Sequence, residues 1–348
     1  MSRPMNTARR RQLTLVAGAA FIMLVLALGA SWQDARRNWQ PAVEGPVLPD
    51  WPQAVASAQS IEIDSAEDHF TLQRTETGWV MPERDGHPVR SARLAELDAF
   101  LSGLEYAGAR TTDPDKHARL GLAADGAEGV GTRVTVRDLD GAVTADIILG
   151  DMRQGRAYVR FPQRNRSWAA RPGETASERP AIETAQDWLD LDFLALGSNE
   201  IARADIAPEQ GPAYRLERAA RSTRNFALRQ PAGWRPITAA AGNGPASVLS
   251  RVRFRDVRRA DRIAGEVIAR HTAQTFTGLQ VTLEIIALGE TRWARLEASA
   301  LTDDAQAEAA AINAAAEGWA FLLSDLTLDR LVRPLDQIAD PVGGDDAP

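Results

Sequence analysis

Side chains able to carry out catalysis or to bind a metal are few in this sequence and widely scattered. The 348 residues include no cysteine, which excludes a thiolate nucleophile, a disulfide and a cysteine-ligated metal. The four histidines, His69, His87, His117 and His271, show neither an HExxH motif nor the spacing of two histidines on one helical face. Because a zinc site needs ligands that converge, we predict no metal site and interpret these histidines as surface or strand-edge residues.

The common nucleophile and phosphate-binding motifs are also missing from the sequence. It contains no G-x-S-x-G elbow, and no G-x-x-x-x-G-K-[ST] loop surrounds Lys116, the only lysine. We therefore predict a protein that is not an enzyme and that needs no cofactor. An envelope hydrolase is the weakest of the functions considered.

Two groups of aspartates have a spacing that chemistry could use. Residues 138–141, Asp-Leu-Asp-Gly, match the start of a calcium loop, but a strand pattern follows them in place of the remaining ligands. A hairpin turn accounts for them. Asp187, Asp190 and Asp192 surround Trp188 and could act as paired carboxylates in a sugar site. We favour a capped segment that closes a domain, because caps and turns commonly carry aspartate.

The densest charge cluster is basic, although the chain as a whole is acidic. The net charge of −7 and the pI of about 5.3 argue against a nucleic-acid partner. A solvated face is the simplest interpretation of the cluster, which Asp256 and Asp261 interrupt. The alternative is a strip that binds an acidic partner or anionic lipid headgroups. The candidate residues of this strip are Arg251, Arg253, Arg255, Arg258, Arg259 and Arg262.

The N-terminal region predicts a membrane anchor. Three arginines, residues 9–11, precede an uninterrupted apolar run at residues 13–30, which is long enough for a short spanning helix. The positive-inside rule places residues 1–12 in the cytoplasm and the bulk of the chain outside it, in the periplasm. A cleaved signal peptide ending near Ala30 is the alternative, but its apolar region would be unusually long. Residues 31–58 carry four prolines and are predicted to be an extended linker.

The remaining chain predicts an α+β fold of two related units, residues 59–200 and 201–338, built from antiparallel hairpins with packed helices. Residues 70–79 and 226–234 share a pattern of Phe-x-Leu followed by a turn and Gly-Trp, which indicates an internal repeat. Residues 339–348 are predicted to be a disordered acidic tail.

Matching spacings after these hairpins predict further equivalences. Leucines at steps of three and four residues after Ser91 predict a helix. The same spacing at Val248, Val252, Val257 and Ala260 predicts a helix in the second unit. We align residues 280–286 with the strand at 133–137, and we predict a helix at residues 303–316.

Several of these patterns resemble the family called domain of unknown function 4340. They are the F-x-L-x-R…G-W hairpin at residues 70–79, the L…L…L-x-Y-A-x-A-R helix end at 97–110 and the V-T-V…D-G…I-L-G hairpin with Tyr158-Val-Arg160. The Trp188-Leu-Asp closure and the terminal Gly318-Trp pattern also fit, so the resemblance covers roughly residues 60–338.

The resemblance implies a bacterial protein anchored in the inner membrane. It also implies partners, an ABC-2-type permease and its gliding-motility-like auxiliary subunit, and it implies no catalytic residues. We therefore expect a non-enzymatic accessory or binding subunit of such a transport complex. The alternative is a cell-envelope module that binds glycan or lipid, for which an exposed aromatic groove on Trp79, Trp168, Trp188 or Trp234 would be the sign.

Overall fold

The computed structural model describes residues 18, 20–29, 31, 43–123 and 129–342. Within the predicted anchor, residues 18 and 20–29 are helical with exposed side chains, and the other residues of the run lie outside the described part. The N-terminal tail and any signal-peptide cleavage site also lie outside it. Among the described residues, none of the helices has the length and apolar character needed to cross a membrane.

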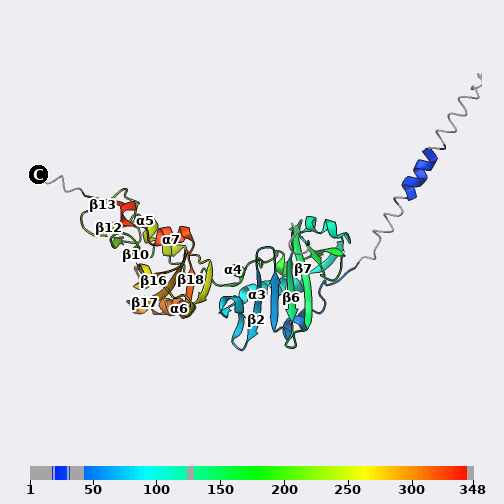
Figure 1. The fold of residues 1–348 in the computed structure, drawn as a ribbon, viewed down its shortest axis with the longest axis horizontal. Helices are drawn as coiled ribbons and strands as arrows, with labels where there is room; N and C mark the ends of the chain where they lie inside the picture. The colour runs from blue at the N-terminus through cyan, green and yellow to red at the C-terminus, as the bar shows by residue number, and fades with distance from the viewer. Residues whose placement is uncertain (1–17, 19, 30, 32–42, 124–128, 343–348) are drawn as a thin grey trace, which may run out of the picture.

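The first unit is a nine-stranded antiparallel sheet in the order β4-β3-β2-β1-β6-β7-β8-β9-β5 (Figure 1). Helix α3 (Ser91–Ser102) buries Leu97, Phe100 and Leu101, and a short α4 (Ala185–Trp188) closes the unit. The strands are β1 (Ser60–Asp64), β2 (His69–Thr75), β3 (Gly78–Met81), β4 (His87–Pro88), β5 (Glu105–Ala109), β6 (Thr132–Arg137), β7 (Val143–Arg153), β8 (Arg156–Arg160) and β9 (Ser167–Arg171).

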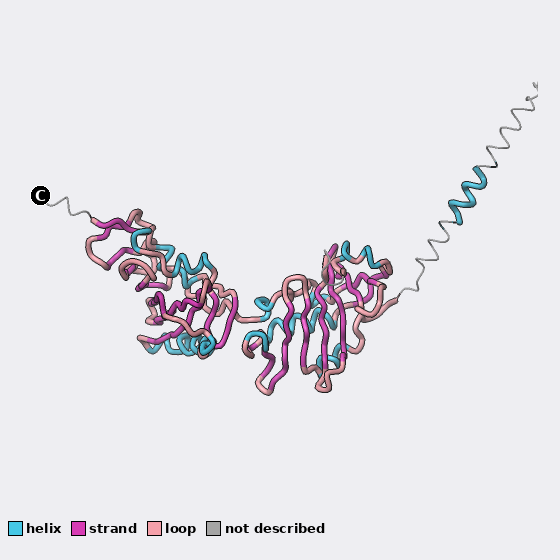
Figure 2. Tube along the Cα trace, viewed as in Figure 1, coloured by secondary structure: helices cyan, strands magenta, loops and turns pink. Residues whose placement is uncertain are grey.

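The second unit is an eight-stranded antiparallel sheet in the order β12-β11-β10-β15-β16-β17-β18-β14. Its helices are α5 (Asn243–Ala246), α6 (Gln306–Ala316), which packs on β17, and α7 (Asp325–Leu331). Figure 2 shows the strands of each unit running side by side with short helices around them. The strands are β10 (Ile201–Ala207), β11 (Tyr214–Glu217), β12 (Ala227–Gln230), β14 (Asp256–Arg259), β15 (Val267–Thr275), β16 (Leu279–Leu288), β17 (Thr291–Ala300) and β18 (Trp319–Leu322), and β13 (Trp234–Pro236) pairs separately with β19 (Ala339–Pro341).

Both sheets follow one strand order, apart from the additional β4 at the edge of the first. Their first hairpins also share a register. In the first unit Ile63 lies opposite Phe70, and in the second Ile206 lies opposite Tyr214. All four of these side chains are buried, so each hairpin presents the same kind of apolar face to its own core.

The equivalence predicted between residues 70–79 and 226–234 is wrong by one strand. Residues 70–79 form β2 and β3, which pair with each other. Residues 226–234 instead contain β12, which pairs with β11, and the start of β13, which leaves the main sheet to pair with β19. The alignment of residues 280–286 is displaced in the same way, because they belong to β16, which stands where β7 stands in the first sheet.

The helix predicted through Val248, Val252, Val257 and Ala260 is also wrong. Residues 248–250 form one 3-10 turn, and Val257 lies in strand β14. The first unit shows the same change of structure, because its helix ends at Ser102 and Tyr106 lies in strand β5. The helix at residues 303–316 is confirmed as a 3-10 turn that continues into α6.

The proline-containing linker predicted at residues 31–58 ends earlier than expected. Helix α2 (Trp51–Ser57) belongs to the first unit: Trp51 is only 2% exposed, and its indole Nε1 donates to Asp98 Oδ1 at 2.9 Å. Pro46 pairs with Glu105 at the free edge of β5. At the other end of the chain, Ala339 is buried in β19, so the predicted tail cannot begin there.

Candidate functional site

The two units meet where the β3–β4 turn of the first reaches strand β14 of the second. The Arg84 Nε lies 2.5 Å from the Asp256 Oδ1. The Asp85 side chain, 6% exposed, accepts from the Arg262 guanidinium at 2.5 Å and from the Arg259 backbone N–H at 3.0 Å. We call these five residues the inter-unit clasp. The Arg84, Asp85 and Asp256 side chains are shielded, the Arg262 side chain is exposed, and Arg259 contributes its backbone N–H; these contacts join the two sheet edges.

An aromatic contact lies beside the clasp. The His87 ring packs edge-on against Trp319 with 4.6 Å between ring centroids, and the Arg259 guanidinium lies 4.5 Å from the Trp319 ring. The His87 Nδ1 donates to the Pro88 carbonyl at 2.9 Å. Burial, assisted by the Arg259 charge, lowers the pKa of His87 and keeps the ring neutral, which suits apolar packing.

The chain that connects the units is packed along its length. Leu191 and Leu194 are buried, and the Leu191 carbonyl accepts from the Phe254 N–H at 3.0 Å. Phe193, Phe254 and Phe321 form a cluster with ring centroids 4.8–5.9 Å apart. The connection therefore adds apolar burial to the ionic clasp.

The predicted arginine strip divides into two halves. Arg259 and Arg262 belong to the clasp, and the Arg258 Nη1 donates to the Glu83 carbonyl at 2.8 Å. The Arg258 and Arg262 side chains thus contact the chain's own first unit, whereas Arg259 contributes its backbone N–H and its guanidinium lies over Trp319. That these residues bind a partner stays a prediction. Arg251, Arg253 and Arg255, which we call the arginine row, are exposed.

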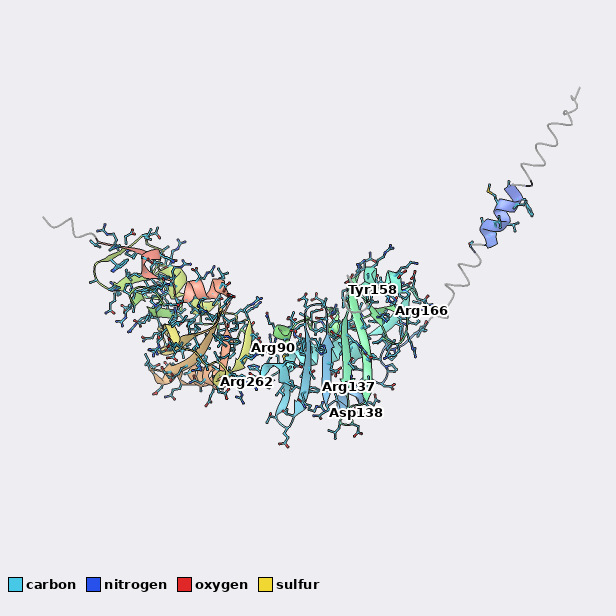
Figure 3. The ribbon with its side chains drawn as sticks, in the orientation of Figure 1. Arg90, Arg137, Asp138, Tyr158, Arg166 and Arg262 are labelled. Atoms are coloured by element: carbon cyan, nitrogen blue, oxygen red, sulfur yellow. The ribbon has the colours of Figure 1, made fainter. Side chains whose placement is uncertain are left out.

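A cleft of about 210 Å³ lies between the arginine row and the first unit. The Arg90 Nη1 and the Arg253 Nη2 each lie 4.0 Å from an oxygen of Asp192. Figure 3 places Arg90 at the junction of the units together with Arg262 of the clasp. The cleft thus brings one arginine from each unit to a single carboxylate, at distances longer than a good hydrogen bond.

A larger hollow of about 590 Å³ opens on the first unit between the 47–51 segment, β7 and the turn after β8. Its half-buried aromatic residues are Tyr106, whose ring lies 4.8 Å from that of Trp168, and Phe161, whose ring lies 5.9 Å from the Arg164 guanidinium. Burial raises the pKa of Tyr106. The hollow combines aromatic faces with polar rims, the composition of a binding site.

Of the two aspartates that line this hollow, Asp146 is fully engaged in hydrogen bonds. Asp146 accepts from Arg133 at 2.9 and 2.8 Å, from Gln163 at 3.0 Å and from Thr135 at 3.3 Å. Burial alone would raise the pKa of Asp146, but these hydrogen bonds together lower it below its usual value. A carboxylate held ionised in this way positions neighbours and is a poor general acid.

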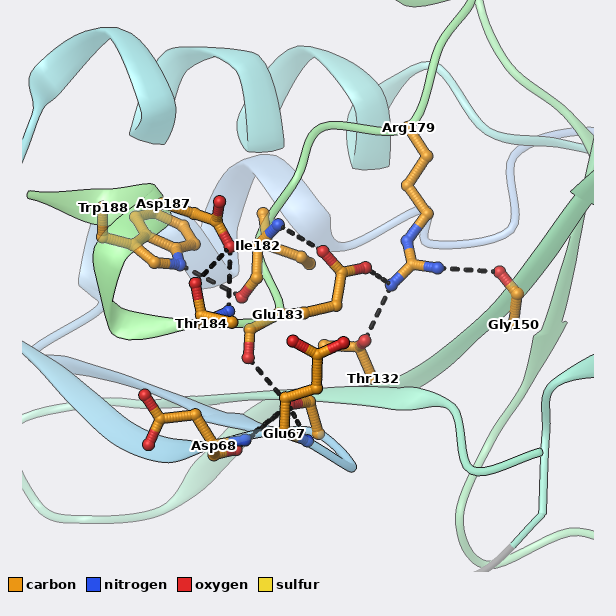
Figure 4. Close-up of polar contacts among 11 residues, drawn as sticks. Glu67, Asp68, Thr132, Gly150, Arg179, Ile182, Glu183, Thr184, Asp187 and Trp188 are labelled. Atoms are coloured by element: carbon orange, nitrogen blue, oxygen red, sulfur yellow. Dashed lines mark hydrogen bonds and ion pairs between the residues drawn. The ribbon is translucent and has the colours of Figure 1, made fainter. Parts of the chain in front are cut away.

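Of the three aspartates around Trp188, only Asp187 forms a structural cap, whereas burial and the neighbouring Asp192 raise the pKa of Asp190. Thr184 and Asp187 make a capping box at the start of α4, with Asp187 Oδ2 accepting from the Thr184 N–H at 2.9 Å (Figure 4). The Trp188 indole is buried and donates to the Ile182 carbonyl at 3.2 Å. Residues 138–141 form the expected turn, in which Asp138 Oδ1 accepts from the Ala142 N–H at 2.9 Å.

The same close-up contains an ion pair in which Arg179 is mostly buried and Glu183 is partly buried. Arg179 contacts the Glu183 carboxylate and donates to Thr132 Oγ1 at 2.7 Å and to the Gly150 carbonyl at 3.0 Å (Figure 4). These bonds tie the segment before α4 to strands β6 and β7, a structural role.

The histidines lie only partly where the sequence placed them. His69 is exposed, and His87 lies in the edge strand β4, although its ring is buried. His117 and His271 are buried, so their prediction as surface or strand-edge residues is wrong. His117 Nε2 donates to the Asn165 carbonyl at 2.9 Å. Within the described ranges, no group of three or more histidine and carboxylate residues is placed to hold a metal ion. Of the four tryptophans named for an aromatic groove, Trp188 is buried and the others are half-buried.

The sequence marked the arginine side of the clasp as a charge cluster, but no local pattern predicted which residues pair there or which segments form the hollow. Arg84 and Asp256 are 172 positions apart, and the hollow is assembled from three distant segments. The internal repeat was the only signal that the two units would meet.

A family model described as Domain of unknown function (DUF4340) matches residues 79–264, which is more than half of the chain. The chain belongs to this family. The DUF4340 match begins in β3 and ends after β14, so it contains both sides of the inter-unit clasp. No curated protein and no solved structure matches the chain.

Proposed function

We propose that this DUF4340 protein is a non-enzymatic, membrane-anchored accessory subunit that contributes binding surface to a transport complex. The observation that carries the proposal is the junction. Charged groups there hold two β-rich units together and leave a row of exposed arginines on one side. Such an arrangement supports recognition over an extended surface.

The location proposed is the bacterial inner membrane, with residues 13–30 as a single-pass anchor and the two sheets in the periplasm. The arginines at residues 9–11 and the apolar run after them support this orientation. A reporter that is active only after export, fused after Pro348, should be active, and the mature protein should keep its N-terminus. A soluble form that begins near residue 31 would refute the anchor.

The partner class proposed is an ABC-2-type permease with its auxiliary subunit, the class that the family resemblance implies. An anchor confines the protein to the plane of the bilayer and raises its effective concentration near a partner in the same membrane. Co-purification in mild detergent, with and without residues 13–30, tests this assignment. Recovery of no membrane partner in either form would contradict it.

The second candidate function is an envelope module that binds glycan or lipid without transport. The hollow on the first unit supports it, because Tyr106 and Phe161 offer ring faces next to the polar side chains of Gln163 and Arg164. Titration of envelope oligosaccharides into the full chain, with Tyr106→Ala as the variant, separates the two functions. Saturable binding that Tyr106→Ala abolishes would favour the module.

A further inference from the structure

The arginine row has a fixed backbone beneath exposed charges. Its three arginines alternate with Val252 and Phe254, which are 3% and 1% exposed. The Phe254 N–H donates to the Leu191 carbonyl at 3.0 Å, and the Arg255 N–H donates to the Leu322 carbonyl at 2.8 Å. The connecting chain at Leu191 and strand β18 at Leu322 therefore hold the backbone of the row. Only its guanidinium side is open to a partner.

The charges of the row are hardly neutralised within the described part of the chain. Arg251 and Arg255 have no ion pair or side-chain hydrogen bond to another described residue, and Arg253 reaches Asp192 only at 4.0 Å. Arginines elsewhere at this junction are closely paired, as Arg84 and Arg262 are at 2.5 Å. An unpaired cationic row is unusual on a chain whose net charge is −7.

We propose that the arginine row, together with Arg90, binds an extended acidic segment of a partner protein. The exposed arginines of the row alternate with buried residues, so a strand with carboxylates at every second position, roughly 6.6–6.8 Å apart, presents its charges in the same alternating order. Guanidinium groups bind carboxylates in a bidentate fork. A partner carboxylate entering the cleft takes up the two long contacts that Asp192 makes with Arg90 and Arg253.

The position and the size of the row favour a short acidic protein segment over nucleic acid or a lipid surface. Three arginines neutralise few phosphates of a long nucleic acid, whereas each can pair with one carboxylate of a short segment. The chain enters the first unit next to β5, whereas the junction lies at the β4 side, the opposite edge of the same sheet. The row is therefore at the far edge from the point at which the anchor segment joins the unit.

This inference rests on the proposed function, because it names the chemistry of the partner. The probe is a fluorescent synthetic peptide with glutamates at alternate positions. Its reference is a peptide of the same composition with the glutamates in one block. The full chain in mild detergent is titrated and the anisotropy is measured. We expect the alternating peptide to bind more tightly, and we expect R251E/R253E/R255E to weaken its binding by about tenfold or more.

A matched variant controls for total charge. R119E/R156E/R235E reverses three other exposed arginines that lack ion pairs to described residues, and it should bind as the wild type does. R251K/R253K/R255K keeps the charge but loses the bidentate fork, and it should weaken binding by a few-fold. Equal loss in both reversal variants, or no preference for the alternating peptide, would overturn the proposal. Binding to anionic vesicles through the row, without peptide binding, would assign the row to lipid headgroups and also overturn it.

Co-purification separates this inference from the function on which it rests. If the wild-type chain recovers a membrane partner and R251E/R253E/R255E recovers it equally well, the docking site is wrong and the accessory function stands. If the wild-type chain recovers none, the function itself fails. Loss of the partner only in the row variant supports both.

Discussion

We predict that His271 makes the second sheet sensitive to acid. It lies in β15 opposite Ile206, with a side chain that is fully buried, and Val134 takes the matching position opposite Ile63 in the first sheet. The His271 Nδ1 donates to the Leu331 carbonyl at 2.8 Å, and Nε2 has no partner among the described residues. A proton added at Nε2 would place an uncompensated charge in the core.

The size of the effect follows from the pKa. Burial lowers the pKa of His271 from 6.5 to about 4, although the Leu331 carbonyl and the Asp205 charge act in the opposite direction. This change in pKa between the unfolded and folded chain corresponds to about 3 kcal/mol of folding free energy. Because the folded-state pKa is depressed, the unfolded chain binds the proton first as the pH falls. The contribution to stability is complete above about pH 6.5 and is lost progressively down to about pH 4.

The test substitution is His271→Val, because valine is the residue at the matching position of the first sheet, Val134. Loss of the bond to Leu331 and removal of the unpaired Nε2 should nearly offset each other at neutral pH, within about 1 kcal/mol. Urea unfolding, followed by tryptophan fluorescence from about pH 7.5 to about pH 4.5, should show a smaller acid loss in the variant by about 2–3 kcal/mol.

His69→Val is the matched control, because His69 is exposed on a strand of the first sheet. It removes a histidine without changing the core of the second sheet, so it separates the effect of the buried ring from that of the substitution itself. The reasoning would be refuted if His271→Val and the wild type lost the same free energy over this range, since the burial of the ring would then carry no titration cost.

Three further substitutions test the packing. Asp85→Ala should destabilise the junction by about 1–3 kcal/mol, because it removes a shielded acceptor of two bonds, and limited proteolysis should then cut the segment between the units faster. Trp51→Ala should cost about 3–5 kcal/mol in the unfolding of the first unit, whereas a residue in a linker would cost almost nothing. Glu183→Ala should cost about 3–5 kcal/mol, because Arg179 would remain almost buried without its carboxylate, and near-native thermal stability would contradict the pairing.

The α+β class and most hairpins could be predicted from the sequence because their inward residues alternate as large apolar side chains. Strand β15 was missed, since its inward residues, Ala269, His271, Ala273 and Thr275, are small or polar and leave no apolar alternation. The helix predicted through Tyr106 failed because helical and strand spacings coincide over so few residues. Gly108, at a φ of 138°, belongs to a strand irregularity.

The candidate sites were harder to predict because they depend on contacts between distant parts of the chain. Six arginines in one segment gave a single sequence signal, although the side chains of Arg258 and Arg262 turn toward a loop that lies more than 170 residues earlier. Only the position of β14 at the edge facing that loop decides which arginines are used internally. Trp51 was assigned to a linker because the surrounding prolines disfavour helix, yet Pro52 stands at the start of α2, where a helix tolerates it.

The central claim is that this DUF4340 protein supplies binding surface to a membrane assembly and no chemistry. The most direct measurement is quantitative mass spectrometry of the complex recovered from mildly solubilised membranes, comparing the full chain, the chain without residues 13–30 and R251E/R253E/R255E. The account predicts a multi-span permease and an auxiliary subunit in fixed ratio with the full chain, and strong depletion in both variants. A full chain that recovers no membrane protein, or that turns over an envelope substrate by itself, would contradict the account.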